Sequence, residues 1–200
     1  MGNVRSVSNA FNLLQEEVEI TDEPKKLSDA EAIILPGVGA FSDGIKNLKQ
    51  KGLVTVLEKE VIDKKKPYLG LCLGLEFLAE KSFEGGMHEG LGWIKGTITR
   101  VQPNDPQLTV PHIGWDDTTI LRKDGLFKDI EEPVFYYVHS YFFKVDNSEK
   151  NVITSICNYG GVPITATIQK GNIYATQFHP EKSQTTGIKL LQNFLDDIRK

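Results

Sequence analysis

The segment Gly70-Leu71-Cys72-Leu73-Gly74 most constrains the fold, because it joins an apolar strand-like run directly to an apolar helix-like run. A cysteine at the apex of so tight a turn needs small residues two positions to either side, where a Cβ would clash. The pattern predicts an α/β domain with Cys72 raised at the end of a core strand. The free N–H groups of the following helix favour a thiolate, so we expect a lowered pKa for this thiol. The alternative is a buried structural cysteine in a glycine-containing turn.

The order of expected elements predicts one domain, residues 1–200, with two halves of different character. The first half alternates strands and helices, which is typical of βαβ units and a parallel sheet. Its helices are expected at 6–15, 43–64 and 74–80, and its strands at 32–35 and 67–71. The second half adds strands at 94–101, 134–145, 152–159, 164–169 and 173–178, then an amphipathic helix at 184–199 capped by Ser183 or Thr185. A parallel core extended by antiparallel strands gives a mixed sheet.

Composition narrows the classes of function. Acidic residues number 27 and basic residues 23, and the resulting net charge of −4 argues against a nucleic-acid-binding protein. No apolar run approaches the roughly 18 residues that a membrane-spanning helix needs. Two cysteines, Cys72 and Cys157, are too few for a disulfide framework and suit a reducing compartment. We therefore expect a cytoplasmic protein with no membrane and no nucleic-acid partner.

A second motif, Gln177-Phe178-His179-Pro180-Glu181, supplies the groups that a nucleophilic cysteine needs. His179 and Glu181 lie two residues apart on extended backbone, so both side chains project to the same side. We expect Glu181 to hold His179 in the tautomer that presents a free nitrogen to Cys72. Alone, the motif is equally an ordinary turn at a strand end. Combined with the cysteine turn, it predicts a Cys-His-Glu triad.

Acyl chemistry also needs N–H donors for a developing oxyanion. The N–H of Leu73 is one candidate. The segment Pro36-Gly37-Val38-Gly39 supplies a second, since its glycines allow peptide orientations that other residues resist. The alternative for this segment is a plain connection from strand to helix.

The remaining histidines and cysteine indicate no metal site, because neither Cys-x-x-Cys nor His-x-x-x-His spacing occurs. His112 and His139 are expected to be hydrogen-bonded structural residues, and His88 to face solvent. Cys157 lies in an apolar strand and is expected to be inert core. The glycine motifs match no dinucleotide or P-loop fingerprint, so no cofactor is expected.

Together these residues resemble the class I, triad-type glutamine amidotransferases, and within that family the glutaminase subunits of imidazole glycerol phosphate synthases. The cysteine turn with His-Pro-Glu marks the class, while Pro-His-Ile-Gly-Trp and Glu-Lys-Ser-Gln mark this group of subunits. The matching segments cover essentially the whole chain: Gly2-Asn-Val-Arg-Ser-Val7, Leu35-Pro-Gly-Val-Gly-Ala-Phe41, Gly70-Leu-Cys-Leu-Gly74, His88-Glu-Gly-Leu-Gly92, Pro111-His-Ile-Gly-Trp115, Val138-His-Ser-Tyr141 and Phe178-His-Pro-Glu-Lys-Ser-Gln184. The resemblance implies a three-layer αβα, flavodoxin-like domain.

The resemblance also implies hydrolysis of glutamine to glutamate and ammonia. Cys72 would attack the side-chain amide and form a glutamyl thioester, while His179, oriented by Glu181, shuttles the protons. By matching position, the oxyanion hole would be made by Val38, Gly39 and Leu73. The glutamine pocket would be lined by Gly39, Glu76, Ser140, Tyr141 and Glu84, the last receiving the α-ammonium group.

A partner is implied in the same way. In this family the ammonia crosses a channel into a (β/α)₈-barrel cyclase, which forms imidazole glycerol phosphate and an aminoimidazole carboxamide ribonucleotide in histidine biosynthesis. The chain would form a heterodimer, with Asn3, Tyr136 and Lys182 near the subunit junction. Glutaminase activity would stay low until the partner binds its ligand, with a peptide near Val38 rotating to complete the oxyanion hole.

Two features depart from the family pattern. Glu76 stands where the family usually carries Gln, and a carboxylate there would raise the pKa of Cys72 or weaken glutamine binding unless it is protonated or paired. Family members also open with a short apolar strand, whereas here Met1 falls inside the turn that follows it, so the N-terminal strand is expected to be missing. We prefer a start codon assigned too late, because a sheet that lacked this strand would be poorly stable.

Other functions stay open at this stage. A related subunit that supplies ammonia to a sugar amidotransferase in surface-polysaccharide biosynthesis would differ mainly in its partner, and Glu76 and Gly92-Trp93 hint at it. A Cys–His hydrolase, such as a small peptidase or deglycase, would act without a partner, and the placement of Glu181 speaks against it. A non-catalytic scaffold is favoured only by Glu76 and the missing strand, and the intact triad argues against it.

Overall fold

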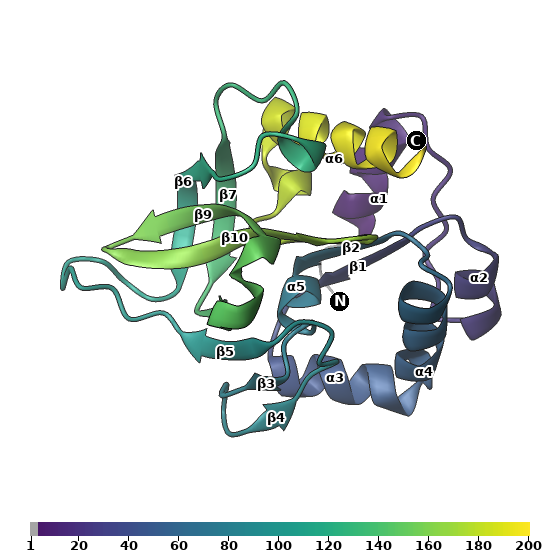
Figure 1. Cartoon of the computed structure of the whole chain (residues 1–200), viewed down its shortest axis with the longest axis horizontal. Helices are drawn as coiled ribbons and strands as arrows, with labels where there is room; N and C mark the ends of the chain where they lie inside the picture. Colours follow the sequence, from purple (N-terminus) through teal and green to yellow (C-terminus); the bar gives the residue numbers. More distant parts are fainter. Residues whose placement is uncertain (1–3) are drawn as a thin grey trace.

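Three parallel strands form the core of the main sheet in the computed structural model, which describes residues 4–200 (Figure 1). Strand β2 (Tyr68–Cys72) is buried along its whole length and pairs in parallel with β1 (Ile33–Gly37) on one side. On its other side β2 pairs in parallel with β11 (Ile173–Thr176). Because parallel neighbours run in the same direction, the segments that follow β1, β2 and β11 leave the sheet at one edge.

Antiparallel strands extend this core into a seven-stranded mixed sheet of order β1-β2-β11-β10-β9-β6-β7. The added strands are β10 (Val162–Lys170), β9 (Ile153–Tyr159), β6 (His112–Ile120) and β7 (Val134–His139). A smaller sheet of order β4-β3-β5-β8 contains β4 (His88–Glu89), β3 (Lys81–Ser82), β5 (Gly96–Arg100) and β8 (Tyr141–Val145). The mixed sheet expected from the sequence is confirmed.

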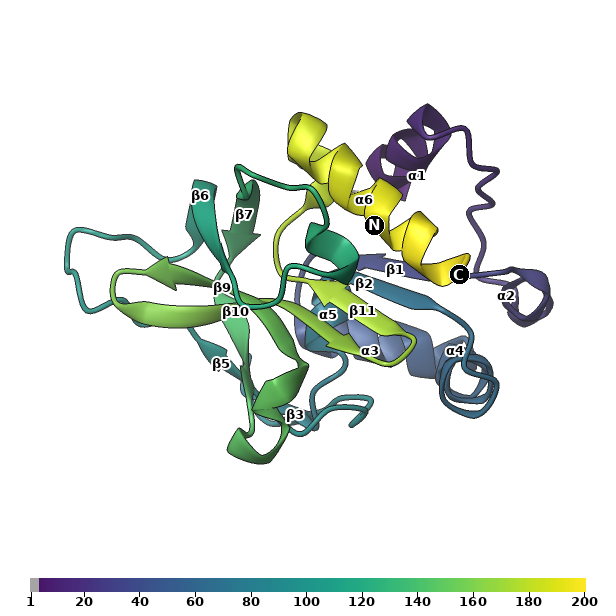
Figure 2. The ribbon, with the colours of Figure 1, turned by 45° about the horizontal axis from the view of Figure 1, so that its top comes forward.

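Helices cover both faces of the main sheet, as Figures 1 and 2 show. Helices α1 (Val4–Leu13) and α6 (Gln184–Ile198) lie on one face, and α3 (Phe41–Gln50), α4 (Leu53–Leu57) and α5 (Leu73–Glu76) lie on the other. Alternate residues of β2 explain the two layers of core. Leu69 and Leu71 pack with α1 and α6, whereas Tyr68 packs with α3 and α4. The remaining helix, α2 (Pro24–Asp29), has no buried residue.

Several expected elements differ from the structure in extent. The helix expected at 43–64 is broken at Gly52, which adopts a φ of +66°, into α3, α4 and a π-helical turn (Glu58–Asp63). The helix expected at 74–80 is reduced to the four residues of α5. The strand expected at 134–145 is two strands in different sheets, separated at Ser140. Strand β6 was not predicted from the sequence.

The N-terminal cap of α6 also differs from expectation. Ser183 occupies the cap position, but its side chain makes no capping bond. Its hydroxyl instead donates to the carbonyl oxygen of His179 at 2.7 Å and accepts from the N–H of Tyr136 at 3.0 Å. Ser183 therefore ties the start of α6 to β7 and to the segment that follows β11.

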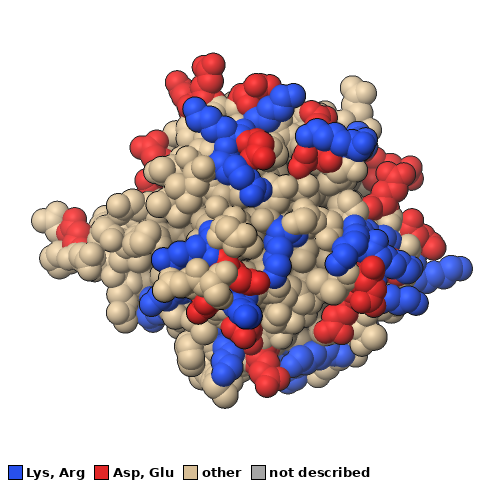
Figure 3. Space-filling model, viewed as in Figure 1, with Lys and Arg blue, Asp and Glu red and all other residues tan. Residues whose placement is uncertain are grey.

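The remaining expectations concern the N-terminus, membrane-spanning helices and surface charge. The expected loss of an N-terminal strand and the residue Asn3 fall outside the described residues. Within residues 4–200, no helix combines the length and the apolar character that crossing a bilayer requires. On the face drawn in Figure 3, basic and acidic side chains are interspersed.

The turn at Cys72 needs its glycines, as predicted. A Cβ on Gly70 would lie 2.5 Å from the carbonyl oxygen of Gly74, and a Cβ on Gly74 would lie 1.9 Å from that of Leu35. Cys72 itself has a φ of +53°, a conformation that costs a non-glycine residue about 1–3 kcal/mol. The close packing of β1 against the start of α5 holds the cysteine in this strained position.

Replacing Gly74 by alanine tests this packing. We expect Gly74→Ala to lower the free energy of unfolding by more than about 3 kcal/mol, because the obstacle is the backbone of a core strand and not a flexible side chain. Urea unfolding followed by circular dichroism measures the loss. The control is Gly85→Ala, where φ is +64° and nothing lies within 4 Å, so only the backbone cost of about 1–2 kcal/mol is expected. Equal losses in the two variants would contradict the packing argument.

Candidate active site

Cys72 and His179 come from neighbouring parallel strands. Leu71 of β2 is in register with Thr176 of β11, so the segments that follow these two strands leave the sheet at the same edge. Cys72 ends β2 and His179 follows β11 by three residues. Their side chains are almost fully buried, with residue exposures of 7% and 1%. This edge, the carboxyl end of parallel strands, is where ligand sites of open α/β sheets form.

Glu181 orients His179, as the sequence predicted. Nδ1 of His179 lies 2.7 Å from Oε1 of Glu181, and both side chains are buried. Pro180 begins a 3-10 turn between them, and His179 keeps an extended backbone with φ of −102°. Because a carboxylate only accepts hydrogen bonds, Nδ1 carries the proton and Nε2 of the neutral ring carries a lone pair. That nitrogen can act as a base.

A cavity of about 250 Å³ adjoins Cys72. Its wall contains every residue that the sequence predicted for the oxyanion hole and the substrate pocket: Val38, Gly39, Leu73, Glu76, Glu84, Ser140 and Tyr141. Pro111, Val138 and His139, to which the sequence analysis gave no substrate role, complete it. Drug-sized ligands occupy roughly 300–1,000 Å³, so this cavity suits a smaller molecule such as an amino acid.

Two backbone segments that could supply N–H donors line the cavity beside Cys72. The N–H of Leu73 points to the sulfur of Cys72 and lowers the pKa of the thiol. Opposite it, Gly39 has a φ of +100°, a conformation that favours glycine, and Val38 beside it is 41% exposed. Both residues are exposed and line the cavity, so the peptide between them lies at the surface.

Glu84 presents a fixed carboxylate to the cavity. Its Oε2 accepts the N–H of Phe41, the first residue of α3, at 2.7 Å. The positive end of this helix favours a negative charge at that place. A carboxylate held in this way is suited to receive a cationic group of a ligand.

Gln177 is a site residue to which sequence reasoning gave no role, although it lies two positions before His179. Its fully buried amide donates to Oε1 of Glu76 at 3.1 Å and to the sulfur of Cys72 at 3.8 Å. One side chain thus bridges the nucleophile and Glu76. A buried polar residue at the end of a strand gave no local signal for this contact, which exists only because β11 lies beside β2.

The pKa of Cys72 is raised, contrary to the expectation from the helix N-terminus. Burial is the main cause, and the negative charges of Glu76 and Glu181 add to it. The N–H of Leu73 and the amide of Gln177 act in the opposite direction and do not compensate. Because α5 has only four residues, its dipole is small and burial prevails. At neutral pH Cys72 is therefore a thiol, and it could act as a nucleophile only with the help of a base.

Glu76 is protonated at neutral pH. Burial raises its pKa to about 8, the charge of Glu84 adds to the rise, and the bond from Gln177 opposes it. The side chain is 5% exposed and no cation is among the causes of its shift. A protonated carboxyl is neutral and can both donate and accept, so at pH 7 it resembles the amide that the family carries there.

The variant Glu76→Gln tests this protonation state through stability. A carboxyl whose folded pKa is raised stabilises the fold fully below its unfolded pKa near 4.5, and loses that contribution as pH rises to 8. We expect the variant and the parent to be similar near pH 4.5, and the variant to become more stable by about a few kcal/mol at pH 8 and above. Urea unfolding at pH 5, 7 and 9 measures the gap, with the exposed Glu89→Gln as control. A gap that does not grow with pH would contradict a buried, protonated Glu76.

Tyr136 and Lys182, expected at a subunit junction, lie together outside the cavity wall. The Lys182 ammonium group sits 5.7 Å from the centre of the Tyr136 ring. Trp115 of β6 packs edge-on against the same ring at 6.0 Å and is 47% exposed, and its neighbour Ile113 is 58% exposed. We call these four residues the aromatic patch. Ile113 and Trp115 add apolar surface that the sequence analysis did not assign.

The structural role expected for the other histidines agrees with their contacts. His112 and His139 are buried and lie 3.2 Å apart, Nδ1 to Nε2. Cys157 is fully buried, as expected for core. Pairing of β6 with β9 also brings it close to His112 and Asp116, a proximity across strands that local spacing does not reveal.

Comparison with known proteins agrees with this geometry. Residues 3–198 match the family model described as glutamine amidotransferase class-I. Imidazole glycerol phosphate synthase subunit HisH 1 of Campylobacter jejuni strain 81-176 is 42% identical over 194 residues, covering 96% of this chain and 94% of that protein. The HisH subunit of Caldanaerobacter subterraneus subsp. tengcongensis is 42% identical over 200 residues, covering 100% of this chain and 95% of the relative.

Solved structures show the same fold at low identity. A crystal structure of a glutamine amidotransferase matches with a TM-score of 0.73 and 21% identity, covering 100% of this chain and 95% of its own. The glutaminase domain of a Trypanosoma brucei CTPS matches with a TM-score of 0.63 and 16% identity, covering 98% and 89%. The chain belongs to the class-I glutamine amidotransferase family, in which it is similar to HisH subunits of imidazole glycerol phosphate synthase.

Proposed function

We propose that this chain hydrolyses glutamine to glutamate and ammonia in the cytoplasm and passes the ammonia to a (β/α)₈-barrel cyclase. In the resulting heterodimer, the cyclase would make imidazole glycerol phosphate and an aminoimidazole carboxamide ribonucleotide in histidine biosynthesis. The observation that carries the proposal is the cavity of about 250 Å³ that joins Cys72 to all the expected pocket residues. The names of the relatives, HisH subunits of imidazole glycerol phosphate synthase, support the pathway.

The chemistry follows from the triad. His179 takes the proton of the Cys72 thiol while the sulfur attacks the side-chain carbonyl carbon of glutamine. The negative charge on the carbonyl oxygen is received by the N–H of Leu73 and by an N–H of the Val38-Gly39 segment. His179 then gives its proton to the leaving nitrogen, so ammonia departs and a glutamyl thioester remains. Water, deprotonated by His179, cleaves the thioester to glutamate and restores the thiol.

The substrate is oriented by its amino-acid end. Glu84, held by the N–H of Phe41, receives the α-ammonium group. Ser140 and Tyr141, at the junction of β7 and β8, line the cavity beside the nucleophile. Glu76 contacts the substrate as a neutral carboxyl below its pKa of about 8, so it does not repel the α-carboxylate at pH 7.

The aromatic patch is the proposed contact with the cyclase. Tyr136 and Lys182 match junction positions of the family, and exposed Trp115 and Ile113 enlarge the surface with apolar area. Aromatic and cationic side chains of this kind dominate binding energy in protein interfaces. Asn3, the third expected junction residue, belongs to the proposed contact through the resemblance alone.

The glutaminase assay tests the proposed reaction. We expect glutamate release from glutamine to be low for the chain alone and strongly stimulated by the cyclase of the same genome with its nucleotide ligand. Cys72→Ala should lower the stimulated rate by at least about a thousandfold, because no other group can form the thioester. The exposed Thr55→Ala, outside the cavity wall, is the control and should keep the parent rate.

The outcomes separate the alternatives. A stimulated rate that survives in Cys72→Ala contradicts the proposed nucleophile. Glutamate release without stimulation by the cyclase contradicts the proposed partner and favours a different ammonia acceptor, such as a sugar amidotransferase. A folded protein with no release under any condition favours a non-catalytic scaffold.

Substitution of Tyr136 tests the proposed interface. We expect Tyr136→Ala to weaken cyclase binding about tenfold or more, since it removes the ring that contacts both Lys182 and Trp115. Titration of the cyclase, followed by stimulation of glutamate release, gives the apparent Kd, and excess cyclase should restore the rate. Lys46→Ala, an exposed site on α3 away from the patch, is the control. An unchanged Kd for Tyr136→Ala would place the interface elsewhere.

A further inference from the structure

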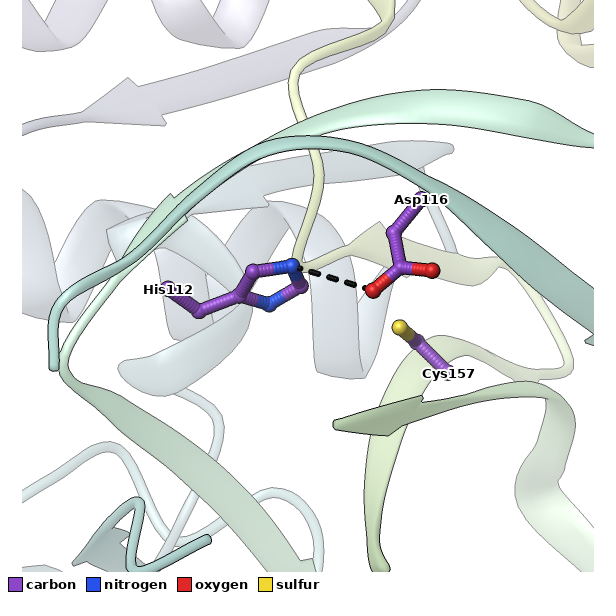
Figure 4. Close-up of side chains that lie close together, drawn as sticks. All are labelled: His112, Asp116 and Cys157. Carbon is purple, nitrogen blue, oxygen red and sulfur yellow. Dashed lines mark ion pairs between the residues drawn. The ribbon is translucent and has the colours of Figure 1, made fainter. Parts of the chain in front are cut away.

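Three side chains from two paired strands lie close together (Figure 4). His112 and Asp116 lie four residues apart on β6, so they share one face of the strand, and Gly114 between them carries no side chain. Cys157 comes from β9, opposite Thr118 in the antiparallel register. One ligand atom from each of His112, Asp116 and Cys157 lies within 4.8 Å of the other two.

Hydrogen bonds fix the tautomer of His112. Nδ1 of His139 lies 2.8 Å from the carbonyl oxygen of Tyr141, which only accepts, so Nδ1 of His139 carries a proton. With that proton on Nδ1, the neutral His139 ring carries a lone pair on its Nε2. Nδ1 of His112, 3.2 Å from that lone pair, must then be the donor. A neutral His112 consequently has a lone pair on Nε2.

The lone pair of His112 faces a carboxylate. Nε2 of His112 lies 3.3 Å from Oδ2 of Asp116, and neither atom of the neutral ring and the ionised acid has a proton to share. The sulfur of Cys157 borders the same point. A cation placed between Nε2 of His112 and Oδ2 of Asp116 would relieve the repulsion of these facing lone pairs, and the sulfur of Cys157 lies within reach as a third ligand.

We propose that His112, Asp116 and Cys157 bind one divalent transition-metal ion with the ligand preference of Zn²⁺. An imidazole nitrogen, a thiolate and a carboxylate oxygen are a donor set that zinc uses, and three protein ligands leave a fourth position for water. Metal bonds of about 2.0–2.3 Å place tetrahedral ligands roughly 3.3–3.7 Å apart. The 3.3 Å between His112 and Asp116 already meets this spacing, and the sulfur, within 4.8 Å of both, needs a shift of at most about 1.5 Å.

The surroundings of His112 match those of a metal-binding histidine. Such residues donate their second ring N–H to an acceptor that fixes the ring, and here Nδ1 donates to His139. The ring is also stacked between Tyr159, at 4.0 Å between centres, and Tyr137, at 4.9 Å. The Asp116 side chain, 33% exposed, gives the ion a route from solvent.

Binding of the ion would displace the proton of Cys157. Burial, with the nearby charge of Asp116, raises the pKa of this thiol to about 12, so the metal-free residue is protonated at neutral pH. A divalent cation reverses that electrostatic effect, because a coordinating thiol is deprotonated. The ion would join β6 to β9 and, through His112 and His139, reach the cavity wall. The proposal is independent of the glutaminase activity.

Metal titration of the chelator-treated full chain tests the site. We expect calorimetry to show one equivalent of Zn²⁺ bound, and Co²⁺ to give the intense visible bands of tetrahedral coordination with a thiolate-to-metal charge-transfer band. Cys157→Ser should abolish the charge-transfer band and weaken Zn²⁺ binding at least about tenfold, and Asp116→Asn should weaken it to a similar degree. Cys72→Ser, which removes the other thiol of the chain, should leave the band and the affinity unchanged.

The outcomes are distinct. Bands that survive in Cys157→Ser and vanish in Cys72→Ser would overturn the proposal, since the metal would then sit on the catalytic thiol. A folded parent chain that takes up neither ion would also overturn it, and a proton would then be the cation between His112 and Asp116. If circular dichroism shows that Cys157→Ser does not fold, Asp116→Asn, at a partly exposed side chain, decides between these results.

Discussion

The close approach of β1 to the turn after β2 is the constraint on which the candidate site depends. Because Gly74 lies against the carbonyl oxygen of Leu35, the chain can pass from strand to helix with Cys72 at a strained apex. The same geometry aims the N–H of Leu73 at the sulfur and brings Glu76, one helical turn later, to the cavity wall. A larger residue at position 74 would therefore disturb the proposed nucleophile, a proposed oxyanion donor and a proposed substrate contact together.

Those parts of the site that depend on local stereochemistry could be predicted from the sequence. The need for glycines around Cys72 and the contact of His179 with Glu181 each depend on residues only a few positions apart, and the structure has both features. Contacts made by strand pairing could not be predicted in this way. Gln177 reaches Cys72 only because β11 lies beside β2. The run at 134–145 divides at Ser140, because its two halves pair with strands of two different sheets.

Electrostatics in the site were harder to predict than geometry, because two opposing effects act on the same sulfur. A helix N-terminus lowers the pKa of a thiol, but α5 is one turn long, and Cys72 lies in a nearly closed site. Burial therefore prevails, and both Cys72 and Glu76 hold their protons at pH 7. In the proposed reaction a thiol in this state depends on a base, which gives the buried bond between His179 and Glu181 its importance.

The proposed partner surface is connected to that base through the backbone. Tyr136 accepts the N–H of His179 at its carbonyl oxygen, at 2.9 Å, and donates its own N–H to the hydroxyl of Ser183. That hydroxyl in turn donates to the carbonyl oxygen of His179, so Tyr136, Ser183 and His179 form a closed ring of hydrogen bonds. Lys182, between Glu181 and Ser183, has its ammonium group over the Tyr136 ring. A protein that binds the aromatic ring of Tyr136 and the ammonium group of Lys182 would therefore contact the same residues that hold the backbone of His179. No further helix or strand would be needed to carry a change at the interface to His179.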